Sequence, residues 1–139
     1  MPVQTPRVFI SFDFDNNVTE KHLFAGQSKN SKTPFDIFDW SSKEALPQHT
    51  WEETIHAKIN KTNMVIVLVG QRMSTATGVA KEIAMAKALN VPVFGVYVGG
   101  ANTASTLPTG LTRGRVISWS WDTIAAAINQ MMGEGKNAK

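Results

Sequence analysis

The sequence predicts an α/β fold, in which helices cover both faces of a parallel β-sheet. Two short runs, Met64 to Gly70 and Val91 to Val98, are apolar without interruption, which is typical of strands buried on both faces of such a sheet. Helical patterns separate these runs from the neighbouring strand candidates. The chain of 139 residues has the usual size of one domain. We expect residues 1–132 to form that domain and residues 133–139 to form a polar tail.

Five strands are predicted in all. The first is Arg7 to Ser11 and the second is Phe35 to Asp39, both short runs of strand-forming residues. The two apolar runs supply the third and fourth strands, and Arg115 to Ser118 supplies the fifth. Because each crossover must return the chain in the same direction, we expect a three-layer, flavodoxin-like arrangement with a parallel sheet in the strand order 2-1-3-4-5.

Four helices are predicted between and after these strands. The first lies within Val18 to Gly26, and the second runs from Thr50 to Lys61 with Thr50 in a capping box at its start. Ala80 to Leu89 is rich in helix formers and predicts the third, whereas Asp122 is the expected cap of the last. Gly99 to Gly114 has the composition of an irregular connection.

Composition excludes several classes of protein. Without cysteine the chain has no disulfide framework, no thiolate zinc site and no cysteine nucleophile, and its three histidines lack metal-ligand spacing, so no metal is expected. The net charge of +3 is mild and no basic stripe interleaved with aromatic residues occurs, which argues against a nucleic-acid partner. Signal-peptide features and a long apolar stretch are both missing, so we expect a cytoplasmic protein without a membrane partner.

A ligand site is expected at the carboxyl ends of the first and third strands, where the strand order reverses. The end of the first strand brings Ser11, Phe12 and Asp13 to this edge, and the end of the third brings Gly70, Gln71 and Arg72.

Glu82, on the helix that follows the third strand, is the candidate acid at this edge. Most glutamates within helices are solvated surface charges. If Val79, Ile83 and Ala86 face the sheet, however, the Glu82 carboxylate faces the crevice. The residues alone therefore predict an acid in a cleft and no particular reaction.

Several segments together resemble one protein family. They are Arg7 to Asp13, Ile66 to Gly70, Val79 to Ile83 and Ser118 to Ile124. In this order and spacing they are similar to the Toll/interleukin receptor (TIR)-like proteins of bacterial anti-phage defence, especially the small Thoeris-type members.

The resemblance implies an enzyme of the NAD nucleosidase or ADP-ribosyl cyclase type, with Glu82 as its catalytic residue. NAD is then the substrate, and no cofactor is implied. The ADP-ribosyl fragment can be captured by water, by its own adenine or by another nucleophile, and the resemblance leaves the product open. Relatives of this kind make such products as second messengers, which implies a downstream effector that senses the nucleotide. The resemblance also implies self-association, with sites completed across a head-to-tail contact.

Substrate contacts are implied for residues that follow the first three strands. They are Ser11, Phe12, Asp13, Asp39, Trp40, Gly70 and Arg72. Arg72 could pair with a phosphate oxygen. Many TIR enzymes have a basic residue just past the first strand and a tryptophan four residues before the glutamate, whereas this chain has Asp13 and Gly78.

Three other functions were weighed. A phosphoacceptor receiver needs an acidic pair after the first strand, which Asp13 and Asp15 supply, and an aspartate at the end of the third, where Gly70 stands instead. A flavin carrier needs a cradle rich in Ser, Thr and Gly after the first strand, and this chain has none. A non-catalytic TIR-like interaction domain remains the serious alternative, because fold does not determine function.

Overall fold

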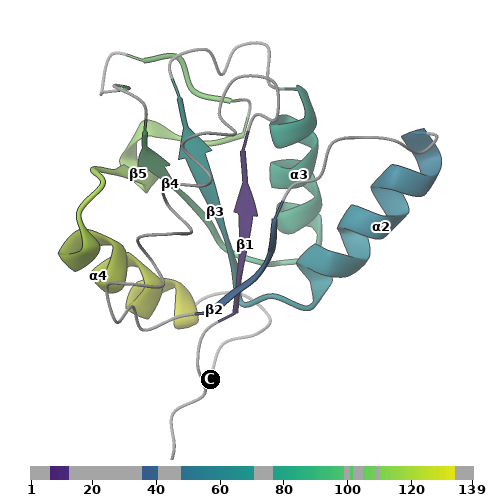
Figure 1. Ribbon diagram of the computed structural model, residues 1–139, viewed down its shortest axis with the longest axis horizontal. Coiled ribbons are helices and arrows are strands. Elements are labelled where there is room, and N and C mark those ends of the chain that lie inside the picture. Colours follow the sequence, from purple (N-terminus) through teal and green to yellow (C-terminus); the bar gives the residue numbers. More distant parts are fainter. Residues whose placement is uncertain are drawn as a thin grey trace, which may run out of the picture.

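One β-sheet organises the computed structural model, which describes residues 7–12, 36–40, 48–70, 77–98, 101, 105–108 and 110–133. Neighbouring strands pair in parallel, in the order β2-β1-β3-β4-β5 (Figure 1). The prediction of an α/β fold with a parallel sheet is confirmed. The strands are β1 (Arg7–Ser11), β2 (Asp36–Trp40), β3 (Met64–Val69), β4 (Val93–Tyr97) and β5 (Val116–Ile117).

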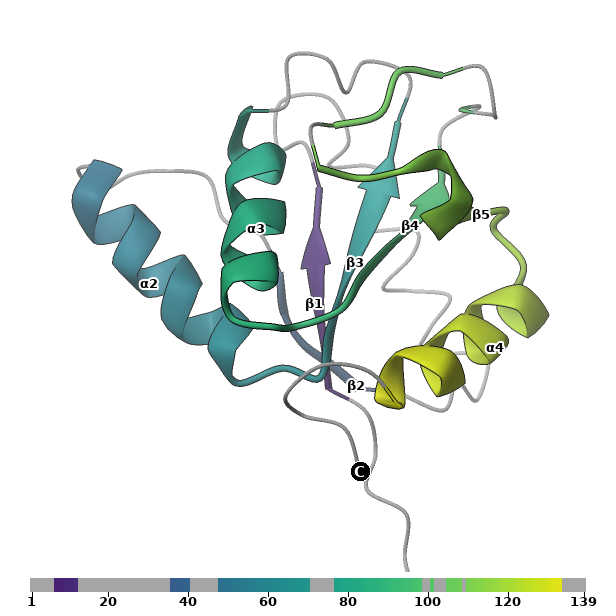
Figure 2. The same ribbon diagram turned by 180° about the vertical axis from the view of Figure 1, so that it is seen from behind.

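Helices cover the sheet on both faces. The helices α2 (Gln48–Asn60) and α3 (Thr77–Ala88) lie on one face, and α4 (Trp121–Met132) lies on the other (Figures 1 and 2). Successive residues of a strand point to opposite faces, so each strand contributes to two separate cores. The α3-side core includes Phe9, Val65, Val67, Ile55, Val79 and Ile83. The α4-side core includes Val8, Ile10, Ile66, Phe94, Ile124 and Ile128.

The helices begin earlier than the sequence predicts. Because α2 begins at Gln48, Thr50 lies inside the helix, and the predicted capping box is wrong. Helix α3 begins at Thr77, three residues before the predicted start. Ser120 is the N-cap of α4, so Asp122 lies within the first turn, where its negative charge still interacts favourably with the helix dipole. Sequence signals locate helix ends only to within a residue or two.

The strands also differ from their predicted bounds. Strand β2 is shifted by one residue and runs from Asp36 to Trp40. Strand β4 begins at Val93, directly after Pro92, which has no N–H group to donate to a neighbouring strand. Strand β5 is only two residues long. The predicted first helix, 18–26, and the tail residues 134–139 lie outside the described residues.

A tight turn connects α3 to β4. Asn90 has a φ of 57°, in the left-handed region that asparagine tolerates better than most residues. Its amide donates to the carbonyl of Lys87 at 3.1 Å, and the Val91 amide donates to the carbonyl of Ala86 at 2.8 Å. These bonds satisfy two carbonyls at the helix end and direct the chain into β4.

No helix in the described ranges is long and apolar enough to cross a membrane.

Candidate active site at the carboxyl edge of the sheet

A buried serine and a buried glutamate meet at the carboxyl end of β1. The hydroxyl of Ser11, the last residue of β1, donates a hydrogen bond to Oε1 of Glu82 with an oxygen–oxygen distance of 2.6 Å. Ser11 is fully buried, and only 1% of the Glu82 surface is exposed. The distance lies in the range of hydrogen bonds from a hydroxyl to an ionised carboxylate. The two residues, far apart in sequence, therefore form one polar unit inside the domain.

Two periodicities bring this pair together. Within β1, Phe9 belongs to the α3-side core, so Ser11, two residues later, faces the same side. On α3, the buried residues Val79, Ile83 and Ala86 form the stripe that packs on the sheet. Glu82 lies beside that stripe, three residues after Val79, and so projects inward rather than into solvent.

The neighbouring α3 lysine has a different environment. The Lys81 ammonium lies 3.6 Å from a carboxylate oxygen of Glu52 on α2, and both side chains are well exposed. Such a surface ion pair adds little to stability. Adjacent charges on α3 therefore have different surroundings: Lys81 is at the surface, whereas Glu82 is in the interior.

Burial of Glu82 carries an energetic cost. Transfer of a carboxylate out of water is unfavourable unless hydrogen bonds compensate for the lost hydration. Replacement of buried charged groups by apolar side chains of similar volume often leaves stability unchanged or raises it. Stability alone thus gives little reason for a glutamate at this position, and its place at the carboxyl edge of the sheet is where α/β folds bind their ligands.

Other predicted site residues fall into three groups. Gly70 directly follows β3 and is buried, while Asp39 and Trp40 occupy the end of β2, paired with Phe9 and Ile10 of β1. These positions share the carboxyl edge with Ser11. Phe12 is 2% exposed and belongs to the α4-side core, so its ring packs on the opposite face of the sheet from Glu82. Asp13 and Arg72 lie outside the described residues.

A family model described as Thoeris protein ThsB, TIR-like domain, matches residues 9–103, more than half of the 139 residues. The chain belongs to this family of TIR-like domains. The matched range contains both Ser11 and Glu82. A prokaryotic SEFIR domain, known from a crystal structure, is similar with a TM-score of 0.54 and 15% sequence identity, and 96% of each chain is covered. At this identity the likeness shows the fold alone. Curated protein sequences gave no match.

The Ser11 hydroxyl should contribute measurably to the stability of this TIR-like domain. In a Ser11→Ala variant Glu82 loses a buried donor, and we expect the free energy of unfolding to fall by about 1–2 kcal/mol. Urea denaturation of wild type, Ser11→Ala, Glu82→Gln and the double variant measures the coupling of the two side chains. Strictly additive effects would show that the hydrogen bond contributes nothing.

Tyr97 is a residue of this TIR-like domain that sequence reasoning missed. It ends β4, pairs with Val69 at the end of β3, and packs against the α3-side core. Its hydroxyl oxygen is buried and has no hydrogen-bond partner within the described part of the chain. Its position as the final residue of the apolar run before Val98 could have indicated a polar group at the carboxyl edge.

Tyr97→Phe should leave the stability unchanged or raise it by up to about 1 kcal/mol, because the substitution removes a buried polar group and keeps the ring. Thermal and urea unfolding of the variant and wild type provide the test. A clear loss of stability would mean that the hydroxyl has a partner in solution.

Proposed function

We propose that this TIR-like domain cleaves NAD between nicotinamide and ribose, with Glu82 as the catalytic carboxylate. One observation carries the proposal: Glu82 is held inside the fold, at the carboxyl edge, by the hydroxyl of Ser11. In doubly wound α/β folds this edge, at the reversal of strand order, is the usual ligand site. Buried ionisable groups at such an edge are candidates for catalysis.

The chemistry requires only groups of this kind. The bond between ribose C1′ and the cationic nicotinamide nitrogen breaks, and its electron pair passes to the ring, which leaves as neutral nicotinamide. Positive charge then develops on the ribose, as in glycoside hydrolysis, and the Glu82 carboxylate stabilises it. A nucleophile adds to C1′ and loses its proton. With water the product is ADP-ribose, and with the adenine of the same molecule it is a cyclic nucleotide.

Space for the substrate comes from small residues on this edge. Gly70 ends β3 without a side chain, and a Cβ placed on Gly78, in the first turn of α3, would meet no atom within 4 Å. A glycine in the position where related enzymes have tryptophan leaves room for a ring of the substrate. We further propose that the end of β2, with Asp39 and Trp40, contacts the nucleotide, and that Arg72 pairs with its phosphates.

The burial of Glu82 bears on regulation. A carboxylate that is 1% exposed can contact ribose only after the atoms covering it move. We therefore propose that the domain has low activity at rest, and that self-association or an infection signal opens the edge. The product would then act on a downstream effector in the cytoplasm.

Nicotinamide release from NAD tests the proposal. Purified protein is incubated with NAD over a wide range of protein concentrations, nicotinamide is quantified, and mass spectrometry identifies the ADP-ribosyl product. We expect release that depends on Glu82 and a specific activity that rises with protein concentration. Flat specific activity would remove self-association from the proposal and leave the chemistry intact.

A non-catalytic interaction domain is the second candidate, and the burial of Glu82 favours it. In that case the Ser11–Glu82 bond only fastens β1 to α3. This candidate predicts no nicotinamide release at any protein concentration, while Glu82→Ala still lowers the stability of the domain.

A further inference from the structure

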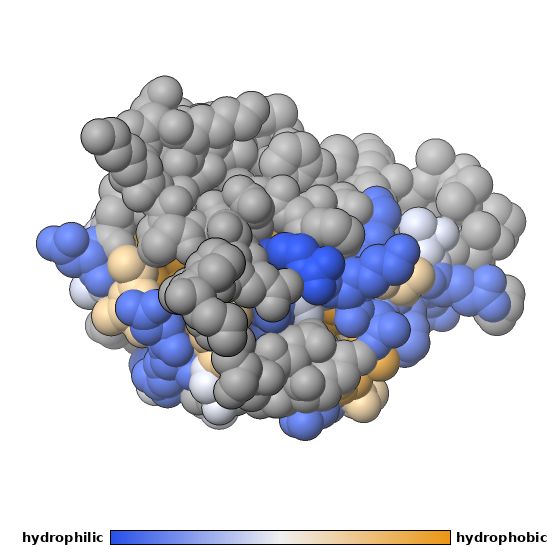
Figure 3. Space-filling view, turned by 90° about the horizontal axis from the view of Figure 1, so that it is seen from below, coloured by the Kyte–Doolittle hydropathy of each residue, from blue (hydrophilic) through white to orange (hydrophobic). Residues whose placement is uncertain are grey.

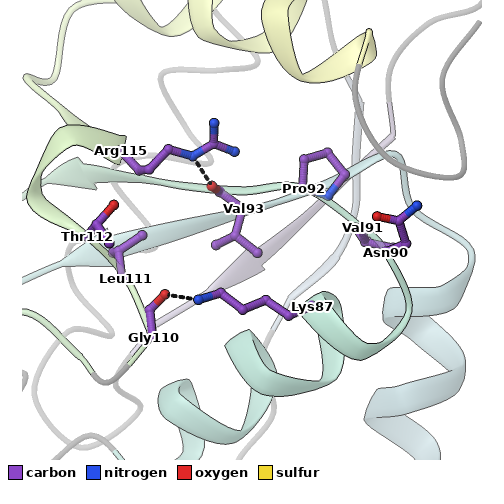
Figure 4. Close-up of a pocket in the computed structure, with 9 residues that line it drawn as sticks. All are labelled: Lys87, Asn90, Val91, Pro92, Val93, Gly110, Leu111, Thr112 and Arg115. Carbon is purple, nitrogen blue, oxygen red and sulfur yellow. Dashed lines mark hydrogen bonds between the residues drawn. The ribbon is translucent and has the colours of Figure 1, made fainter.

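A second pocket lies at the opposite end of the sheet from Glu82. It has a volume of about 290 Å³ and is formed where α3 ends, β4 begins and the chain approaches β5 (Figure 4). Seen from the amino ends of the strands, strongly hydrophilic residues lie beside exposed apolar ones (Figure 3). Nine residues line the pocket: Lys87, Asn90, Val91, Pro92, Val93, Gly110, Leu111, Thr112 and Arg115.

The charged residues of this lining are both cations. The Lys87 ammonium donates to the carbonyl oxygen of Gly110, and Arg115 donates from Nε to the carbonyl oxygen of Val93 at 3.2 Å (Figure 4). A second guanidinium nitrogen of Arg115 lies 3.3 Å from the sulfur of Met131 on α4. None of the nine lining residues carries a carboxylate. An ammonium has three donors, so the bond to Gly110 leaves Lys87 able to bind a further acceptor.

Fixed elements hold the two cations on either side of the first residue of β4. Lys87 belongs to the last turn of α3, and Arg115 ends a short 3-10 turn directly before β5. The connecting segment crosses the face of the sheet beside α3 (Figure 2), and a Cβ at Gly110 would lie only 3.0 Å from Ile83. Gly110 has a φ of +95°, which suits glycine. The backbone of this wall is therefore tightly packed against α3.

The remaining walls are apolar. Val91, Val93 and Leu111 are each at most 7% exposed, and Pro92 is also buried. A concave, largely apolar lining with a few convergent polar groups is typical of small-ligand sites. The volume is at the lower end of the usual range, so it suits a compact ligand rather than a dinucleotide.

We propose that this pocket binds a compact organic phosphate. The phosphate group lies between the Lys87 ammonium and the Arg115 guanidinium, both of which favour phosphate oxygens as acceptors, and the organic part packs on Val93 and Leu111. The site is separate from the proposed NAD site and does not depend on it. Because Lys87 and Glu82 lie on the same helix, an occupied pocket would fix the end of α3 opposite its catalytic region.

Amide chemical shifts of the whole chain, recorded by NMR with inorganic phosphate and with AMP as probes, test the proposal. We expect at least one probe to shift the amides of Gly110, Leu111 and Thr112. Lys87→Gln should weaken that binding about tenfold or more, as expected for loss of a charge-assisted hydrogen bond. Lys81→Gln removes the same charge from an exposed position on the same helix and should change the affinity less than about twofold.

Two results would overturn the phosphate site: no shift at these amides with either probe, or equal binding by Lys87→Gln and wild type. Shifts confined to amides near Ser11 and Gly70 would likewise count against it, because they report the opposite edge of the sheet. Thermal unfolding of both variants verifies that they remain folded. A response to both probes indicates that the phosphate group alone is recognised, and a response to AMP alone indicates that the organic part is needed.

Discussion

Glutamine in place of Glu82 is expected to lower nicotinamide release from NAD by at least about 100-fold. The amide is neutral and cannot stabilise positive charge on the ribose. Its carbonyl oxygen can still accept the hydrogen bond that the Ser11 hydroxyl donates to Oε1, so the fold should persist. Initial rates of nicotinamide release, measured with saturating NAD at equal protein concentration, give the comparison.

Glu52→Gln is the matched control for this variant. Glu52, on α2, forms an exposed ion pair with Lys81, and the same chemical change there should leave the rate within about twofold. Unfolding curves of both variants separate a lost activity from a lost fold. A Glu82→Gln protein that is folded and as active as wild type would exclude Glu82 as the catalytic residue.

Valine in place of Gly95 is expected to lower the free energy of unfolding by about 3 kcal/mol, the upper part of the range for overpacked cores. Gly95 lies in the middle of β4, and a Cβ there would be 3.0 Å from side-chain atoms of both Leu111 and Val69 and 3.2 Å from Val116. Strand propensity alone favours valine over glycine. Packing should outweigh it, because three neighbours contact the same small space. Urea denaturation measures the difference.

Gly114→Val provides the comparison for this substitution. A Cβ at Gly114 would meet no atom within 4 Å, and its φ is not in the left-handed region. We expect a change of less than about 1 kcal/mol there, as for most surface positions. Similar losses for the two variants would show that Leu111 and its neighbours can move aside. A loss of about 3 kcal/mol is a large share of the net stability of an ordinary domain.

The sequence predicts the α/β class because its signals are local. Met64 to Val69 is apolar at every position, and every one of these residues is buried in β3. Spacing on α3 likewise predicts that Val79, Ile83 and Ala86 pack inward and that Glu82 lies beside them, as the structure has them. Such patterns repeat over a few residues and need no knowledge of distant contacts.

Other features depend on contacts between distant segments. The hydrogen bond from Ser11 to Glu82 follows from the placement of α3 against β1, which no local pattern specifies. Alternation along β1 could have placed the Phe12 ring in the opposite core from Ser11, so this part of the site was predictable and was predicted wrongly. The phosphate-binding pocket joins Lys87 to Arg115 through a segment with only an irregular pattern, and the sequence gave no signal for it.

A crystal structure of the Glu82→Gln protein with NAD tests the central claim most directly, because an inactive variant should retain the uncleaved substrate. We expect the ribose that carries nicotinamide to contact residue 82 at the carboxyl ends of β1 and β3, with the side chain no longer covered as it is without substrate. NAD bound elsewhere on the domain, or no bound NAD at concentrations that saturate the wild-type reaction, would contradict the assignment of Glu82 as the catalytic carboxylate.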